Sequence, residues 1–497
     1  MPQVINTNVP SLTSQRALNS SQSALQVSLQ RLSTGLRINS AKDDAAGLAI
    51  SERMTSQIRG LNQAARNAND GISLAQTAEG GLSTMGDLLQ RMRELSVQAA
   101  NGTNSTSDRA QLQAEVLQLT QEVNRVATTT QFNGQNVIDG TLTNSQFQVG
   151  ANANQTISVG IASAKATDIG NYLVASQTGA LGLSTAIGAA TIGAALNGNA
   201  GETLTVSGNG TTSPLTVAAN ASAKAIAAQV NGVSATTGVV ATATTTATLT
   251  NAAATSGNFS FSLIGQNTTA VTIAATVTTS NDLSAIAQAI NAQSGTTGIT
   301  ATSDKAGKLV MTSSTGDDIK IGNLNTAGGL TGFTVQGADV TTAAVTLTNS
   351  AGAGPAVAIG GQLSFDSPNG FTITGSGTTI VSTTAGVAVG SSLSAISALD
   401  ISTTAGANKA LATVDAALTQ INNSRAALGA IQNRFSSTIT NLQSTSENLS
   451  AARSRIQDAD FAAETANMTR NQILQQAGTA MLSQANQLPQ NVLSLLR

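Results

Sequence analysis

The chain has 497 residues, 23 basic and 25 acidic side chains, and a formal charge of −2 at pH 7. Such a balance excludes a basic surface for nucleic acid and argues against binding to an anionic membrane. Cysteine and histidine are absent, which excludes disulfides, thiolate chemistry, Cys/His zinc sites and triads that use an imidazole base. Aromatic residues make up 2%, so an aromatic-lined ligand pocket is not expected. We therefore predict a structural protein without a cofactor or metal site, and not an enzyme.

Charged residues are unevenly distributed. Residues 172–399 carry only eleven of them and are rich in Thr, Ala, Gly and Ser. The segments on either side are more highly charged and show helical periodicity. At about 150 residues per domain, the length predicts two to four domains.

Apolar residues recur every seven positions along the N-terminal part. The first ladder is formed by Leu18, Leu25 and Leu32. After a break at 40–47, the second consists of Met54, Leu61, Ala68, Ala75, Leu82 and Leu89. A third segment follows the polar loop 101–108, where Ser107 or Asp108 is expected to cap a helix.

Two short β elements are predicted after the third helix. Asn133-Gly134 lies between apolar flanks within 131–137, a pattern typical of a hairpin turn. Ile157, Val159 and Ile161 alternate as in a half-buried strand.

The middle of the chain contains a repeat. The segment 225–231 recurs 60 residues later as 285–291, and Thr236-Thr237-Gly238 recurs as Thr296-Thr297-Gly298. Each copy is preceded by an alternating strand and predicts a strand, a short amphipathic helix and further strands. The phenylalanines expected to form small cores here are Phe259, Phe261, Phe333, Phe365 and Phe371. The alternative is Thr/Ala-rich filler without a fold.

The C-terminal part has the most regular pattern. One ladder comprises Val414, Ile421, Leu428, Phe435, Leu442, Leu449 and Ile456, and a second comprises Leu474, Met481, Leu488 and Leu495. A sustained seven-residue repeat favours long helices packed as in coiled coils. Amphipathic helices of an ordinary globular bundle are the alternative.

Acidic residues near the helix breaks are weak candidates for chemistry. Asp43 and Asp44 are adjacent and do not share a helix face, so we expect a helix junction or a cap there, and likewise at Asp458 and Asp460. Asp304 with 317–318 lacks the spacing of a calcium loop. Gly360-Gly361 lacks the lysine of a phosphate-binding loop.

The N-terminus has no basic start followed by an apolar run, and no segment approaches the ~18 apolar residues of a membrane span. We expect no membrane association. The protein is then either cytoplasmic or exported by a route that cleaves no signal.

Several long motifs at both ends resemble bacterial flagellin. They are Ile5-Asn6-Thr7-Asn8, the segment 32–47 (LSTGLRINSAKDDAAG), Gln131-Phe132-Asn133-Gly134, the segment 455–462 (RIQDADFA) and the tail 486–497 (NQLPQNVLSLLR). The resemblance covers about 170 N-terminal and 100 C-terminal residues, and the middle resembles the inserted modules of many flagellins.

This resemblance implies an α+β fold in which paired termini form a helical coiled-coil core and carry inserted β-rich outer domains. The expected segments are 1–45 and 456–497 as the two halves of the coiled-coil core, 46–171 (with a short hairpin) and 400–455 as the two parts of the next helical layer, and 172–399 as the insert. Many copies would polymerise helically into a filament for swimming. The expected polymerisation seam is Leu18, Leu25, Leu32, Leu474, Met481, Leu488 and Leu495.

The resemblance also implies partners and a location. The chain would leave the cell unfolded through the flagellar type III export apparatus, aided by an export chaperone, and join hook-associated proteins outside. A host Toll-like receptor would contact Arg91, Leu95 and Glu115. The residues 493–496 resemble the part read by cytosolic immune sensors. The other interpretation is that Met92, Leu95 and Ala99 pack between helices and the charges form a solvated face. Both can hold, because Arg91 and Leu95 are four residues apart and share a helix face.

Two other functions remain open at this point. A hook–filament junction protein would have similar ends, and a secreted adhesin would use the insert for binding. The full 33–47 motif and the C-terminal tail favour the filament subunit over the junction protein.

Overall fold

The computed structural model describes residues 7–175, 186–251, 256–279, 281–327, 333–338, 344–347, 356–378, 380–381 and 384–495. The chain forms two compact units. The first unit contains residues 1–77, 142–161 and 427–497, and the second contains 78–141 and 162–426. We describe each unit by itself.

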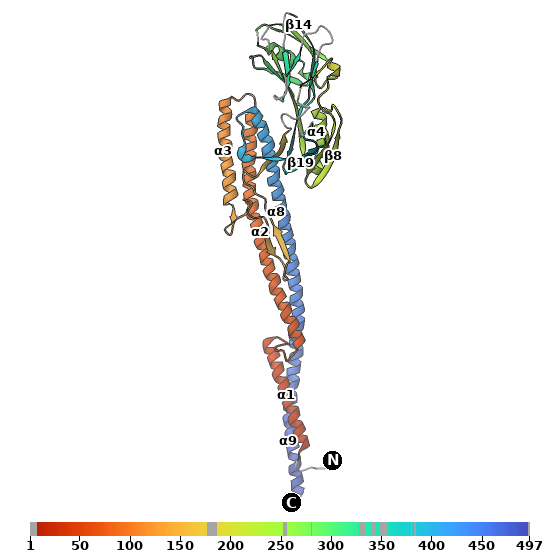
Figure 1. Ribbon diagram of the computed structural model, residues 1–497. Helices are drawn as coiled ribbons and strands as arrows, with labels where there is room; N and C mark the ends of the chain where they lie inside the picture. The colour runs from red at the N-terminus through yellow and green to blue at the C-terminus, as the bar shows by residue number, and fades with distance from the viewer. Residues whose placement is uncertain are drawn as a thin grey trace. The chain divides into compact units, whose positions relative to one another are not determined.

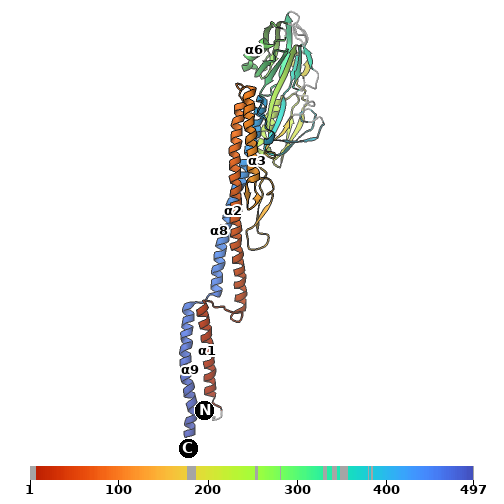
Figure 2. The same cartoon turned by 90° about the vertical axis from the view of Figure 1, so that its left-hand side faces the viewer.

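Long helices dominate both ends of the chain, as the seven-residue ladders predict. They are α1 (Val9–Thr34), α2 (Ala45–Ala100), α3 (Thr106–Thr129), α8 (Thr404–Gln457) and α9 (Phe461–Leu495). In the first unit α1 and α9 lie side by side (Figures 1 and 2). The ladder from Val414 to Leu442 is buried, and its last two members, Leu449 and Ile456, are half-buried.

A ring contact anchors the helices of the first unit. Phe435 of α8 is fully buried and meets Phe147 edge-on, with ring centroids 5.6 Å apart. Phe147 lies on the hairpin of β3 (Ser145–Gln148) and β4 (Thr156–Val159), where Ile157 and Val159 are buried as predicted. Gly71 of α2 packs against the same ring, because a Cβ there would lie 2.6 Å from Phe435 Cζ.

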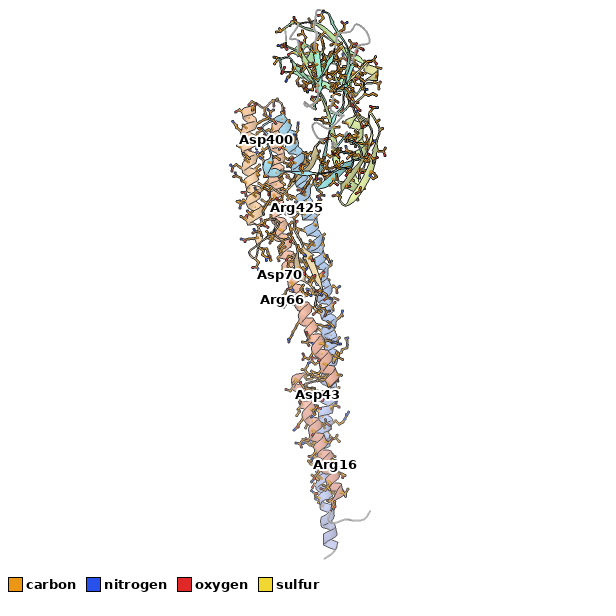
Figure 3. All side chains as sticks on the ribbon, in the orientation of Figure 1. Arg16, Asp43, Arg66, Asp70, Asp400 and Arg425 are labelled. Atoms are coloured by element: carbon orange, nitrogen blue, oxygen red, sulfur yellow. The ribbon has the colours of Figure 1, made fainter. Side chains whose placement is uncertain are left out.

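The acidic residues Asp44 and Asp460 at the helix breaks are caps, as predicted. Asp43, whose place in the chain Figure 3 labels, accepts hydrogen bonds from the backbone N–H groups of Asn39 and Ser40, and these bonds lower the pKa of Asp43. Asp44 accepts from Gly47 N at the start of α2. Asp460 accepts from two N–H groups in the first turn of α9. Asp44 and Asp460 thus complete helix ends, whereas Asp43 closes the loop between α1 and α2.

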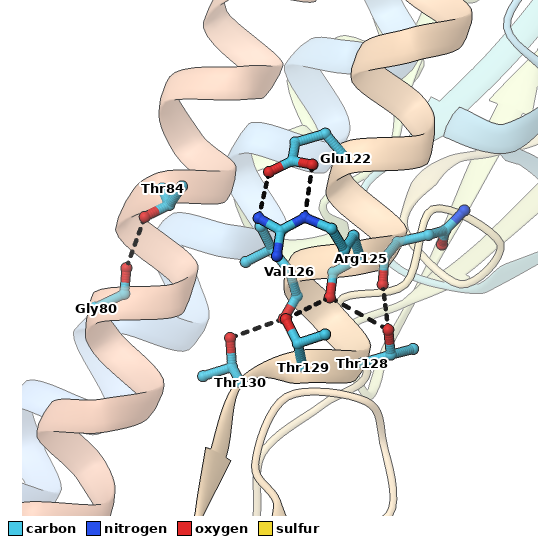
Figure 4. Close-up of polar contacts among 9 residues, drawn as sticks. Gly80, Thr84, Glu122, Arg125, Val126, Thr128, Thr129 and Thr130 are labelled. Carbon is cyan, nitrogen blue, oxygen red and sulfur yellow. Dashed lines mark hydrogen bonds and ion pairs between the residues drawn. The ribbon is translucent and has the colours of Figure 1, made fainter.

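The start of α3 differs by two residues from the prediction. Its N-cap is Ser105, not Ser107 or Asp108, because Ser105 and Asp108 form a reciprocal capping box. The end of α3 is closed by threonine hydroxyls: Thr129 and Thr130 donate to the carbonyls four residues earlier (Figure 4). The predicted hairpin follows as β1 (Gln131–Phe132) and β2 (Gln135–Asn136), with positive φ angles at both residues of its Asn-Gly turn.

The insert contains two copies of one β/α arrangement. The first copy runs through β7 (Glu202–Gly208), β8 (Thr211–Val217), α4 (Ala223–Gly232), α5 (Ser234–Thr237) and β9 (Val240–Asn251). The second runs through β10 (Gly257–Ile264), β11 (Val271–Val277), α6 (Ser284–Ala292), α7 (Ser294–Thr297), β12 (Ile299–Ser303) and β13 (Lys308–Ser313). The predicted repeat is therefore a structural one, and the filler alternative is wrong.

Matching hydrogen bonds explain why the repeat keeps its asparagines. Asn231 clamps the backbone of Ala241, donating to its carbonyl at 2.9 Å and accepting from its N–H at 2.8 Å. Asn291 clamps Ala301 in the same way, at 2.9 and 2.7 Å. Each amide thus fixes the strand that follows its helix.

The remaining strands complete three sheets of the second unit. They are β5 (Gly170–Ala175), β6 (Ala186–Ala189), β14 (Ile319–Ala327), β15 (Phe333–Gly337), β16 (Val345–Leu347), β17 (Ala356–Ile359), β18 (Gln362–Ser367), β19 (Phe371–Gly375), β20 (Ala388–Gly390) and β21 (Ser392–Ala395). The strand orders are β11-β10-β14-β17-β6, β20-β19-β7-β8 and β12-β13-β9-β18-β5-β21, with β15 and β16 attached beside β9.

The insert has two apolar cores, and the five phenylalanines divide between them. One core holds Phe259, Phe261 and Phe333, and the other holds Phe365 and Phe371. All five are at most 4% exposed, as predicted. The chain enters and leaves the insert on paired strands, since β5 and β21 are antiparallel neighbours with Tyr172 opposite Leu393.

In the insert, one oxygen of the Asp318 carboxylate is hydrogen-bonded and the other is not. Asp318 accepts a 2.8 Å hydrogen bond from Asn197, whose amide also donates to the carbonyl of Ala221. The other carboxylate oxygen, Oδ1, is buried without a hydrogen-bond partner. Burial raises the pKa of Asp318 to about 6. Lys320 lowers this pKa and the adjacent Asp317, itself paired with Lys224, raises it.

We predict that Gly71→Ala destabilises the first unit by about 1–3 kcal/mol, because its methyl group would overlap the Phe435 ring. Gly80→Ala in the same helix is the matched control, since nothing lies within 4 Å of a Cβ at that position. This control should raise stability by up to about 1 kcal/mol. Thermal unfolding of the free chain, followed by circular dichroism at 222 nm, measures both. Equal melting temperatures for the two variants would contradict the contact.

We predict that Asp318 makes the insert more stable in mild acid. Its pKa is about 6 folded against 3.8 unfolded, so the stabilisation is complete below pH 3.8 and is lost as pH rises through 6. The two pKa values differ by about 2 units, equivalent to about 3 kcal/mol. Asp318→Asn should remove this slope from the melting temperature between pH 4 and 7. Burial also raises the pKa of Asp366, which leaves a residual slope. Identical pH profiles for the variant and the natural chain would refute the assignment.

Candidate assembly surface

The contact between α1 and α9 is narrow and built largely from small or polar side chains. On α1, Leu18, Leu25 and Leu32 alternate along one face with Ser14, Ser21 and Ser28, and all six are buried or half-buried. On α9 the covered positions are Glu464, Asn467, Met468, Asn471, Gln475, Gly478, Leu482 and Ala485. A Cβ at Gly478 would lie 3.3 Å from Leu18 Cδ1, so the missing side chain leaves room for this leucine. We call this contact the inner seam.

Polar contacts fix the register of the inner seam at both ends. At one end Asn8 caps α1 through Ser11 N and also donates to the carbonyl of Ala485 at 2.9 Å. Ser11 donates to Asn486 at 2.8 Å. At the other end Arg31 lies 3.8 Å from Glu464, which is 8% exposed.

The loops that join these helices to α2 and α8 are also bonded to each other. Ala459 N donates to the carbonyl of Gly35, the left-handed C-cap of α1, and Arg37 N donates to the carbonyl of Gln457. Leu36 and Asp458 form an isolated antiparallel bridge. The apolar periodicity of the sequence does not predict these clamps, although Asn8 followed by Pro10 is a recognisable helix start.

Large apolar side chains remain exposed on the sides of α1 and α9 that face away from the inner seam. We call these residues the outer apolar stripes. They are Val9, Leu12, Val27 and Leu29 of α1 and Phe461, Ile473, Leu474 and Met481 of α9. Ile473 is 59% and Met481 62% exposed in the single chain. Soluble chains rarely leave so many large apolar groups uncovered on two adjacent helices, which marks these sides as contact surfaces.

The predicted polymerisation seam therefore divides into two sets. Leu18, Leu25 and Leu32 face α9 within the chain. Leu474 and Met481 point outward instead, at 49% and 62% exposure. The side chains of Leu488 and Leu495 lie outside the described residues. The described members of this ladder, Leu474 and Met481, are thus not the residues by which α9 meets α1.

An open groove of about 720 Å³ lies in the first unit, between the β3–β4 hairpin and α8. Its lining includes Leu61, Val149, Ile157, Arg434 and Leu442. Both apolar and charged groups reach it, so it offers a mixed surface beside the helices. It contains no group of acidic side chains.

Arg91 and Glu115 form a charged pair on the surface of the second unit. Arg91 is 2.9 Å from Glu115 on α3 and 2.9 Å from Glu94 on its own helix. Hydrogen bonds from Arg91 to Glu94 and Glu115 raise the pKa of Arg91, and the bond to Glu94 has the larger effect. Both residues are accessible, as their predicted receptor contacts require.

The third predicted receptor contact, Leu95, is buried in the single chain. Leu95 is 1% exposed and packs in the helical part of the second unit together with Met92 and Ala99, each 0% exposed. A helix turn separates Arg91 from Leu95, but burial by the neighbouring helices removes Leu95 from the surface. The packing alternative holds for this residue.

Sites of other kinds are not found among the described residues. In the parts of the chain that the structure describes, no helix is long and apolar enough to cross a bilayer. Where side chains are described, no three acidic residues gather as metal ligands would. Asp304 accepts from the N–H groups of Ala306 and Lys308 and so stabilises its own turn.

Comparisons with protein families match both ends of the chain and part of the insert. The bacterial flagellin N-terminal helical region matches residues 5–143, and the C-terminal helical region matches 411–496. The flagellin hook IN motif matches twice, at 203–255 and 258–315, which coincides with the two repeats of the insert.

Full-length relatives carry the same family name. The chain is 46% identical to the B-type flagellin of Pseudomonas aeruginosa and 39% identical to a flagellin of Salmonella typhimurium, each over 100% of both chains. A solved structure of FliC from Burkholderia pseudomallei is 24% identical, with 73% of this chain and 99% of that chain covered and a TM-score of 0.30. The 46% identity over the full length of both chains, together with the two terminal family matches, shows that the chain belongs to the bacterial flagellin family.

Proposed function

We propose that this chain is the structural subunit of a bacterial flagellar filament and polymerises helically to serve swimming motility. The outer apolar stripes of α1 and α9 carry the proposal, because their side chains are 39–62% exposed in the part of the chain that the structure describes. Burying one large apolar side chain yields about 1.5–3 kcal/mol. Eight such residues supply a large driving force for stacking copies through their terminal helices.

The filament subunit is favoured over the junction protein. The relatives that match this chain along its length, at 34–46% identity, are named flagellins. A junction protein caps or links a filament and is needed in few copies, whereas a filament subunit must stack on itself. The family is a structural one, and we propose no enzymatic activity.

We propose that successive segments of the chain form successive layers of the filament. Residues 1–45 and 456–497 would form the innermost coiled coil, and 46–171 with 400–455 the next layer. The insert 172–399 would project outward. Support comes from the junctions, since α1 ends at Thr34, α2 begins at Ala45, and α8 passes into α9 between Gln457 and Phe461.

We further propose that the subunit is secreted unfolded through the flagellar type III apparatus, with an export chaperone, and meets hook-associated proteins in the extracellular filament. The absence of cysteine supports this route, because no disulfide obstructs an unfolded chain. A host Toll-like receptor remains a proposed partner through Arg91 and Glu115 alone, both of which lie on the surface.

We predict that Leu474→Asp blocks polymerisation without unfolding the chain. Leu474 is 49% exposed, so the free chain should melt within about 1 °C of the natural one. In the polymer a carboxylate would replace a buried apolar group at a cost of several kcal/mol, or more than about 100-fold in critical concentration. Sedimentation and electron microscopy measure the polymer.

Gln472→Asp is the control for charge alone, because Gln472 is an exposed polar residue of the same helix. It should polymerise at a similar concentration. If Leu474→Asp polymerised as well as this control, the outer apolar stripe of α9 would not be an assembly surface.

We predict that the insert is dispensable for assembly. Replacing 176–391 with a short Gly/Ser linker keeps β5 and β21, whose paired backbones lie only about 5 Å apart. Expressed in a strain without its own filament, the shortened chain should form thinner filaments that electron microscopy detects. Secreted chains that never polymerise would show that the insert makes essential contacts between subunits.

A further inference from the structure

The two repeats end their sheets on equivalent edge strands. β8 (211–217) and β11 (271–277) both have seven residues, and each begins 60 residues from its counterpart. Among the described residues, β8 pairs only with β7 and β11 only with β10. Each therefore presents one row of free backbone N–H and C=O groups.

Only the first of these edges carries a proline. Pro214 lies opposite Thr205 in β8, and the equivalent residue of β11 is Ala274, opposite Ser260. β11 reads Val-Thr-Ile-Ala-Ala-Thr-Val and has neither proline nor charge. The other described strands at sheet ends, β6, β12, β20 and β21, have three to five residues. β11 is thus the long, unblocked edge.

The proline also reveals which way the backbone points. Proline has no N–H and is tolerated in a sheet where that group would face the free edge. Pro214 therefore marks a position whose N–H and C=O point away from β7. By the correspondence of the repeats, the N–H and C=O of Ala274 point away from β10.

The sequence of β11 is nearly symmetric about this same residue. In an antiparallel pair centred on Ala274, Thr272 meets Thr276 of the second copy, and Val271 meets Val277. Thr272, Ala274 and Thr276 are exposed on one face, while Ile273 and Val277 are 1% exposed on the other. Like side chains would thus meet on the exposed face and at the ends of the buried face, where only Ile273 meets a different residue, Ala275. Each Ala274 would exchange two hydrogen bonds with its twin.

We propose that two copies of this chain associate through β11, in antiparallel register centred on Ala274, so that the sheets β11-β10-β14-β17-β6 of the two inserts become one. A seven-residue strand pair buries far less than the roughly 1,200 Å² of a stable interface. The pair is therefore weak between free chains and is populated where many copies are held close together. It adds a contact between inserts that polymerisation through the terminal helices does not require.

The absence of cysteine makes the register directly testable. Ala274→Cys places two thiols opposite each other, about 5.5 Å apart between Cα atoms, which is within disulfide range. Mild oxidation of the full chain, as free subunits and after assembly, should give a covalent dimer on a non-reducing gel. Thr272→Cys and Thr276→Cys should each give none alone, because four residues separate the twin thiols. An equimolar mixture of these two variants should form the dimer.

The first repeat supplies the blocking variant. Ala274→Pro copies the residue that β8 already tolerates, so circular dichroism should show an intact fold. In this background the Thr272→Cys and Thr276→Cys mixture should lose the dimer. The proposal would be overturned if Ala274→Cys formed no covalent dimer in either sample, or if Thr276→Cys alone formed as much covalent dimer as Ala274→Cys. Filaments without cross-links would refute only this pairing, and the proposed filament function would stand.

Discussion

The α1–α9 contact is too narrow to bury the apolar residues of the two helices that make it. Leu18 packs against Gly478, and serines alternate with the leucines of α1, so the helices approach closely over one thin face. The larger residues Leu12, Ile473 and Met481 are left outside. A chain built this way is incomplete by itself, because its hydrophobic driving force is realised only when other copies cover the two helices.

The rest of the molecule supports that arrangement. The bonds between Gly35 and Ala459 and between Arg37 and Gln457 tie two segments that are far apart in sequence, so both terminal helices start from one joint. Phe435 holds α2, α8 and the β3–β4 hairpin around a single ring. The insert begins and ends on paired strands with its own two cores, which separates its folding from that of the terminal helices.

Sequence periodicity predicted the helices, the hairpin and the repeat because each depends on local pattern. The same periodicity placed Leu474 and Met481 on one seam with Leu18. A seven-residue ladder shows which residues share a helix face, but not which partner covers that face. The choice of Gly478 and Ala485 as the face toward α1 depends on close approach, which side-chain hydrophobicity does not encode. The sequence left Leu95 as a receptor contact, a helix-packing position or both, and the packing of neighbouring helices shows that it is buried.

The central claim is that the outer apolar stripes are exposed in the free chain and covered in the polymer. Hydrogen–deuterium exchange with mass spectrometry tests it directly, by comparing α9 with α8 in free chains and in assembled filaments. We predict that α9 amides exchange much faster than those of α8 in the free chain and become as protected as α8 on assembly. Exchange of α9 at the same rate in both states would contradict the account.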